Sequence, residues 1–183
     1  MLRRLILIIG ISLWIFSCNT KPTVVIVTSK GEIEIELDTE FAPKHSENFL
    51  KLINERYYIG TTFHRVEPGY LIQGGDPNSK DSDRSNDGAG GPSYRIDAEI
   101  KLLHKYASVG AARWPDQVNP QRQSNGSQFY ICLKDMPALD RGGYTVFGKV
   151  VRGMDVVEKI SLVEADPRNN PLNPVLIEQA YVK

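Results

Sequence analysis

The sequence of 183 residues lacks several features that would assign a class of protein at once. Lysine and arginine together number 22, as do aspartate and glutamate, so the formal net charge is zero and no positive excess favours a nucleic-acid partner. The apolar run LILIIGISLWIF holds only twelve residues, short of the roughly 20 that a comfortable membrane span needs. What remains is the ordinary apolar and charged content of one soluble globular domain.

Cysteine is also scarce, since Cys18 and Cys132 are the two that the sequence contains. Cys132 lies in the apolar run FYICL, where a lone cysteine usually acts as a small hydrophobic residue. No histidine stands near it in the sequence to activate a thiol. A disulfide between the two cysteines can form only if Cys18 is not acylated.

The N-terminal segment is typical of an export signal. A basic start, MLRR, is followed by the apolar run and then by SCNT. The stretch IFSC resembles the lipobox at which bacterial lipoproteins are acylated on cysteine and cleaved before it, although Phe16 is larger than the usual residue there. The resemblance implies a signal peptide over 1–17, a lipidated Cys18, and a short tether over 18–22.

The expected location is the cell envelope. Asn19 is not the aspartate that retains some lipoproteins at the inner membrane, so an outer-membrane lipoprotein facing the periplasm is expected. A secreted or soluble periplasmic protein is the alternative. Loss of Arg3 and Arg4 with the signal would leave 20 basic and 22 acidic residues, a net charge of −2.

Residues 23–183 read as many short strands with one helix early and one late, which favours an antiparallel barrel or sandwich. In GEIEIEL, for example, Ile33, Ile35 and Leu37 alternate with glutamates, as in a half-buried strand. Two strands are expected within 23–37 and single strands over 61–66, 70–76, 106–113, 127–133, 144–151 and 173–183, with helices over 42–58 and 153–163 and long loops over 77–93 and 114–126.

Motifs in four segments resemble, in order and spacing, those of the cyclophilins, a family of peptidyl-prolyl cis–trans isomerases. They are FHRVEPGYLIQGGD (63–76), GAGG (88–91), NGSQFYI (125–131) and TVFGKVVRGMDVVEKI (145–160). The likeness runs from about residue 23 to the end of the chain. It implies a mainly β fold, a closed eight-stranded antiparallel barrel capped by two α-helices. It also implies proline-containing polypeptides as partners, and it needs no metal or cofactor because rotation about an Xaa–Pro bond makes and breaks no bond.

By this resemblance Arg65 is the catalytic arginine, and Gln73 orients both Arg65 and the substrate carbonyl. Tyr70 and Leu71 match the aromatic residue of the proline pocket and its aliphatic neighbour. The other substrate-binding positions that the resemblance implies are Tyr130 as the pocket floor, Leu139 as its wall, Gln128 as a polar contact in the groove, Ala112 and Arg113 on the strand that pairs with the peptide, and Tyr144 where many members carry histidine.

Three departures from the family pattern bear on the site. Tyr70 and Tyr130 replace common phenylalanines, which keeps the pocket and adds a polar tip. Ala138 stands where the members that bind cyclosporin tightly have tryptophan, so weak cyclosporin binding is expected. The loop over 114–124 is longer than in compact members and either alters substrate choice or is only a surface loop.

Each of these residues also has a structural reading. Arg65 could be an ion-pair residue, and His64 is expected to be a hydrogen-bonded scaffold histidine because the reaction transfers no proton. Asp76 is expected to cap a turn, and the glycines of 88–91 to supply positive φ or close approach. DRSNDG resembles the start of a calcium loop, but Tyr94 stands at its twelfth position, where a glutamate is required.

The function alternatives are an isomerase, a peptide-binding chaperone or assembly module with little turnover, and a barrel whose pocket is blocked by Tyr70 or Tyr144. An Arg65 paired with a carboxylate would favour the second. A monomer is expected because nothing in the sequence suggests an additional apolar interface.

Overall fold

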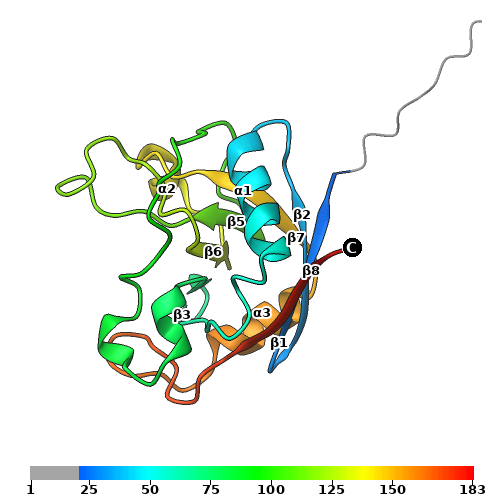
Figure 1. Cartoon of the computed structure of the whole chain (residues 1–183), viewed down its shortest axis with the longest axis vertical. Helices are drawn as coiled ribbons and strands as arrows, with labels where there is room; N and C mark the ends of the chain where they lie inside the picture. Colours follow the sequence, from blue (N-terminus) through cyan, green and yellow to red (C-terminus); the bar gives the residue numbers. More distant parts are fainter. Residues whose placement is uncertain (1–20) are drawn as a thin grey trace, which may run out of the picture.

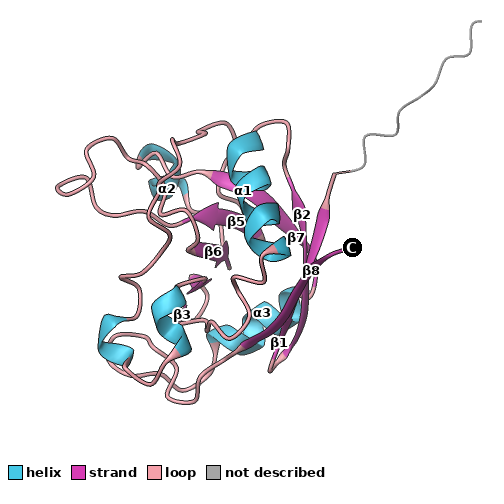
Figure 2. Ribbon diagram, viewed as in Figure 1, coloured by secondary structure: helices cyan, strands magenta, loops and turns pink. Residues whose placement is uncertain are grey.

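The computed structural model describes residues 21–183; the expected signal peptide and Cys18 lie outside the described residues. An eight-stranded antiparallel sheet forms the body of the protein, with helices against it (Figures 1 and 2). The strands are β1 (Thr23–Thr28), β2 (Gly31–Leu37), β3 (Arg65–Glu67), β4 (Leu71–Gly74), β5 (Ser108–Ala111), β6 (Phe129–Cys132), β7 (Val146–Arg152) and β8 (Ile177–Val182).

The sheet has the order β3-β4-β6-β5-β7-β2-β1-β8 and is an open half-barrel, so the expected closed barrel is wrong. Within residues 21–183 the outer strands β3 and β8 form no ladder with each other. The gap is crossed by irregular contacts instead, including a bridge between Thr62 and Leu176 and a hydrogen bond from Phe63 N to Val175 O. Pro171 and Pro174 precede β8 and, lacking an N–H, cannot donate to a ladder there.

Three α-helices are present where two were expected. The two expected helices are α1 (Pro43–Asn54), which begins on Pro43, and α3 (Met154–Ser161). The third, α2 (Pro137–Arg141), is only five residues long, too short to show a helical period in the sequence. The loop expected over 77–93 contains two 3-10 turns, η1 (Pro77–Lys80) and η2 (Arg84–Asn86). No helix within the described residues is long and apolar enough to cross a bilayer.

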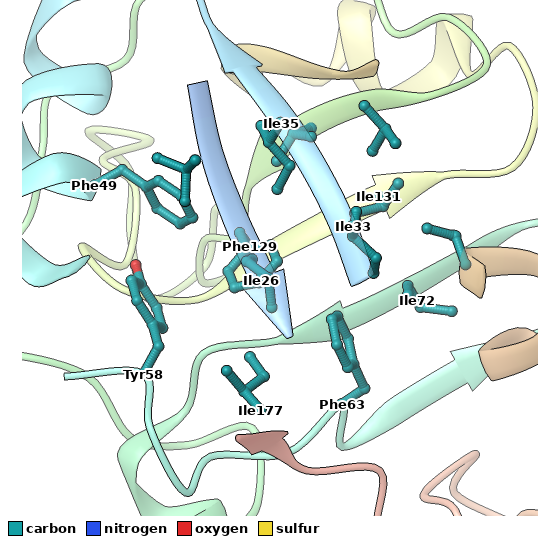
Figure 3. Packing of buried hydrophobic residues seen from close by; sticks show 14 of the residues in the cluster. Ile26, Ile33, Ile35, Phe49, Tyr58, Phe63, Ile72, Phe129, Ile131 and Ile177 are labelled. Atoms are coloured by element: carbon teal, nitrogen blue, oxygen red, sulfur yellow. The ribbon is translucent and has the colours of Figure 1, made fainter. Parts of the chain in front are cut away.

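The main core fills the concave side of the sheet beneath α1 and α3. Figure 3 shows Phe49 and Tyr58 entering the same space as Ile26 of β1 and Phe129 of β6. Phe49 packs edge-on against Phe129, with 5.5 Å between ring centroids. Burial of these large side chains from distant segments fixes the curvature of the sheet and hence the position of its outer face.

The alternation expected in β2 is confirmed on its apolar side, where Ile33, Ile35 and Leu37 are all fully buried. On the opposite side of β2, Glu34 is less exposed than a glutamate on an open strand face would be. Glu34 is buried because the side chains of Lys183 and Arg152 pair with its carboxylate. These pairs join β8 and β7 to β2 and close the outer surface at this point.

Candidate active site

The register of β3, β4 and β6 places three of the expected site residues side by side. Arg65 is opposite Gln73, and Gln73 is opposite Tyr130. Directly paired residues in antiparallel strands lie about 5 Å apart, so their side chains meet on one face. The neighbours Val66 and Ile72 point to the opposite face and belong to the main core.

A chain of hydrogen bonds fixes the polar side chains of this row. Arg65 donates from Nη1 to Gln73 Oε1 over 3.2 Å, and Gln73 donates from Nε2 to Gln128 Oε1 over 2.9 Å. Gln128 in turn donates to the carbonyls of Gly88 and Gly90. Each amide therefore has one consistent orientation, and the loop over 88–91 sets the direction of Arg65 through two glutamines.

Arg65 has a second partner that the sequence analysis did not identify. Its Nε donates to Glu67 Oε1 over 2.8 Å, and Nη2 contacts the same oxygen. The two residues lie two apart on β3, so their side chains share a face, and this spacing was the signal available in the sequence. The Arg65 side chain remains 40 % exposed, so it stays accessible from solvent despite these bonds.

An apolar cluster separate from the main core surrounds Tyr130. Most of the expected substrate-binding residues belong to it, together with Cys132 and Met136, which were not anticipated as part of a pocket. Cys132 shares a face of β6 with Tyr130, so alternation along the strand could have indicated it. The buried members are Leu71, Ala112, Tyr130, Cys132 and Met136, with Tyr70, Leu139 and Tyr144 packed against them.

The added hydroxyl of Tyr130 is buried and satisfied. It lies 2.7 Å from His104 Nε2, and His104 Nδ1 lies 2.6 Å from Asp140 Oδ1. Burial lowers the pKa of His104, so the ring is neutral; Nδ1 donates to Asp140 and Nε2 accepts from Tyr130. A β-carbon at Gly110 would lie 2.4 Å from the ring, so Gly110 lets Tyr130 lie flat against β5.

Arg113 and Ala112 line the groove in different ways. The Arg113 guanidinium lies 4.4 Å from the centroid of the Tyr144 ring, pairs with Asp116 and donates to Gly142 O, so it supports the wall of the cluster. The backbone of Ala112 is already bonded on both sides, its N–H to Gln128 O and its carbonyl to Asn125 N. Both backbone hydrogen-bonding groups of Ala112 are therefore used within the domain itself.

The loop over 88–91 is held by one carboxylate. Asp76 caps η1, as expected, by accepting from Asn78 N, and its other oxygen accepts from the N–H groups of Gly88 and Gly90. Gly88 has a φ of +88°, and a β-carbon at Gly90 would lie 2.1 Å from Asp76. Glycine is therefore required at both positions, which confirms the expected close approach.

The expected hydrogen-bonded role of His64 is wrong. Its side chain is buried, and neither ring nitrogen has a hydrogen-bond partner within residues 21–183. Burial lowers its pKa, so the ring is neutral. Cys132, by contrast, has the expected packing role, since burial raises the pKa of its thiol to about 12 and keeps it protonated.

An arginine, two oriented amides and an apolar cluster around Tyr130 thus lie together on one face of the sheet. The comparisons identify the family. Residues 23–182 match the family model described as cyclophilin type peptidyl-prolyl cis-trans isomerase/CLD. The chain belongs to this family and is a peptidyl-prolyl cis–trans isomerase.

Several relatives are similar over most of their length. Peptidyl-prolyl cis-trans isomerase A of Dickeya dadantii is 35 % identical over 91 % of this chain and 87 % of its own. Peptidyl-prolyl cis-trans isomerase ppi1 of Schizosaccharomyces pombe is 40 % identical over 84 % of this chain and 94 % of its own.

Solved structures share the fold. A cyclophilin-type isomerase of Cryptosporidium parvum aligns with a TM-score of 0.79 and 30 % identity over 89 % of this chain and 98 % of its own. A second crystal structure of that protein, in the presence of the dipeptide Ala-Pro, has a TM-score of 0.77. The region from about residue 23 therefore matches nearly the whole length of these relatives.

Proposed function

We propose that Arg65 and Gln73 are the catalytic residues of this isomerase and that the cluster around Tyr130 holds the proline ring. The observation that carries the proposal is the hydrogen-bonded row from Arg65 through Gln73 to Gln128, which borders that cluster. Proline-containing polypeptides are the proposed substrates, supported by the relative crystallised in the presence of Ala-Pro.

The chemistry follows from amide resonance. The barrier to rotation is about 18–20 kcal/mol, and it falls when the prolyl nitrogen becomes pyramidal and regains its lone pair. A guanidinium aimed at that lone pair stabilises the twisted state relative to both planar isomers. Arg65 supplies this donor, Gln73 fixes its direction and contacts the carbonyl, and the apolar pocket holds the ring while the preceding residue turns.

The test uses residues 19–183 and follows exchange of a short Xaa–Pro peptide by NMR. We expect Arg65→Ala to lower kcat/KM by roughly 10²–10³-fold, the usual cost of losing one transition-state donor. Arg56→Ala removes an exposed arginine at the end of α1 and serves as the matched control. Full activity of a folded Arg65→Ala variant would remove Arg65 from the mechanism.

The Arg65–Glu67 pair favours a second candidate function, a peptide-binding chaperone or assembly module with little turnover. A carboxylate bonded to two nitrogens of the guanidinium reduces its positive potential. Peptide binding measured by chemical-shift titration beside the exchange assay separates the two candidates. Saturable binding without accelerated exchange would establish the binding module and exclude the catalytic proposal.

At the level of the cell, we propose that the chain is divided into a signal peptide over 1–17, a tether over 18–22 and the isomerase domain over 23–183. Cys18 then carries lipid, and the monomeric domain assists the folding of exported proteins in the cell envelope. Uncatalysed prolyl exchange takes roughly 10–100 s, slow enough to limit folding after export.

The lipid anchor is tested by expressing the full chain and a Cys18→Ala variant in a bacterium that processes lipoproteins. The expected result is an acylated Cys18 detected by mass spectrometry and a membrane-bound wild type, with the variant neither acylated nor cleaved at this position. A soluble, cleaved protein without lipid would support the secreted or periplasmic alternative.

A further inference from the structure

A second hollow adjoins the proposed catalytic residues on the side of η2 and the loop that precedes β8. Its volume is about 180 Å³. Hereafter it is called the arginine pocket, and the lining residues that matter are His64, Arg65, Arg84, Asp87, Arg168 and Asn170. Gln73 also lines it, so the arginine pocket opens beside the row of Arg65 and Gln73.

Hydrogen bonds hold the walls of the arginine pocket in place. Asp166 accepts from the backbone N–H groups of Arg168 and Asn170 and so closes a tight turn. Asn170 donates to Asp87 over 2.7 Å, which joins this turn to the segment after η2. Arg168 donates to the carbonyl of Arg84 over 3.2 Å. The two arginines therefore lie on segments that are tied to each other.

The charges in the arginine pocket do not balance. Three arginines line it against one carboxylate, that of Asp87. Arg65 is paired with Glu67, and Arg168 lies 3.8 Å from Asp166. Arg84 forms no ion pair within the described residues: Nη1 donates to Leu172 O over 3.4 Å, and Nη2 is buried without a partner there. A buried guanidinium nitrogen without an acceptor is costly, and an anion would satisfy it.

His64 gives a second, independent indication of a ligand. Its side chain lines the arginine pocket and is 5 % exposed, and neither ring nitrogen has a hydrogen-bond partner of good geometry within residues 21–183. Burial lowers the pKa of the ring, and this effect is larger than the opposite effect of the nearby backbone of Thr62, which raises it. A neutral imidazole has one N–H donor and one acceptor, and buried polar groups of this kind are nearly always paired in folded proteins. An unpaired histidine beside an unpaired guanidinium nitrogen marks a polar site that the protein's own side chains leave unsatisfied.

We propose that the arginine pocket binds the carboxylate of an acidic residue in the same peptide whose proline lies beside Arg65, so that the enzyme favours prolines flanked by aspartate or glutamate. The volume is several times the roughly 30 Å³ that a water molecule occupies, which admits a carboxylate with a water or two. The planar fork of Arg84 suits a carboxylate geometrically. This inference rests on the proposed catalytic site, since the shared lining residues are what place the acidic residue near the proline.

The test is a peptide series with a central Ala–Pro bond, in which Glu and its neutral match Gln occupy each neighbouring position in turn. The expected result is one position at which Glu raises kcat/KM over Gln by roughly tenfold, as one charge-assisted hydrogen bond allows. Added salt reduces the preference because the pocket is partly open to solvent. Residues 19–183 are used throughout.

Variants locate the source of the preference. Arg84→Gln and the double variant with Arg168→Gln are expected to bring the Glu-to-Gln ratio close to one, whereas Arg56→Gln, which removes the same charge elsewhere, leaves the ratio unchanged. Thermal unfolding confirms that each variant is folded. A Glu preference that survives in the double variant would overturn the proposal.

The remaining outcomes separate this inference from the proposed function. If the enzyme turns over every peptide but no position favours Glu, the arginine pocket does not select substrates and the catalytic proposal stands. If no peptide is turned over, the catalytic proposal itself fails. If inorganic phosphate shifts the His64 resonances while Glu gives no preference, the pocket binds free anions and the substrate inference is wrong.

Discussion

Along β4, Ile72 points into the main core while its neighbours Leu71 and Gln73 face the groove, and β6 repeats the pattern with Ile131 and Tyr130. The inner face packs into the main apolar core, whereas the outer face combines an apolar pocket with an ordered chain of side-chain hydrogen bonds. Stability and chemistry are thus assigned to alternate residues of the same strands. Substitutions one position apart should therefore have different consequences.

The largest effect on folding is expected from the inner face. Ile131 is fully buried on β6, and Ile131→Ala leaves a cavity that should lower the free energy of unfolding by about 2–5 kcal/mol. Urea unfolding followed by circular dichroism measures this. The activity per folded molecule should stay within a few-fold of wild type; a collapse of activity in the folded variant would mean that the two faces are not independent.

Acid tests both regions, because each contains buried histidines, and burial lowers the pKa of His64 beside the site as well. His45 bonds to Glu99 and Ser124 beside the core, and His104 supports the floor of the pocket. Burial lowers the pKa of both rings, so the unfolded chain binds more protons and stability falls as the pH drops below about 6.5. Each proton contributes at most about 1.4 kcal/mol per pH unit.

Urea unfolding at neutral and mildly acidic pH measures how the free energy of unfolding changes with pH. His45→Gln is expected to remove the contribution of one histidine to this pH dependence of stability. It should leave prolyl exchange at neutral pH unchanged. A stability that rises on acidification would contradict the assignment of neutral, buried rings.

A smaller effect on catalysis is expected at Gln128, which acts on Arg65 only through its hydrogen bond with Gln73. Gln128→Leu keeps most of the side-chain volume but removes the acceptor for Gln73 and the bonds to Gly88 and Gly90. We expect kcat/KM to fall roughly tenfold, close to the value of one or two hydrogen bonds that orient a catalytic group. A drop in Tm as large as that of Ile131→Ala would instead indicate a structural role.

The smallest effect is expected at Glu67, whose carboxylate accepts hydrogen bonds from the Arg65 guanidinium. Glu67→Gln keeps a possible acceptor and removes the negative charge. Because both side chains are partly exposed, the pair is worth at most about 1 kcal/mol, so kcat/KM should rise by no more than about fivefold. A decrease in the exchange rate would show that Glu67 positions Arg65 rather than weakening it.

The sequence predicted the outer-face residues better than the closure of the sheet. Arg65, Gln73 and Tyr130 were identified from the spacing of the motifs, and the register of β3, β4 and β6 places these residues directly opposite one another. The open seam between β3 and β8 depends on how two segments far apart in the chain meet, which local periodicity does not indicate. Helix α2 was missed because five residues contain little more than one turn.

Two site features were missed for a different reason. The spacing on β3 places Arg65 and Glu67 on one face, but the hydrogen bonds between them and the unpaired nitrogens of His64 are properties of side-chain geometry. Whether a hydrogen-bond partner lies within reach of His64 is decided by segments far apart in the chain. The lipid anchor at Cys18 stays a prediction.

The pairing of β1 with β8 brings the two ends of the domain together, since Val24 lies opposite Val182. A circular permutant that joins these ends by a short linker and opens the chain in an exposed loop should keep its sheet. The same arrangement has a mechanical consequence. A tether that enters at Thr23 applies its tension to β1, and β2, β7 and β5 separate β1 from the strand that carries Tyr130. For the proposed tether, we expect load to act on this side of the sheet and to leave the groove on the other side unchanged.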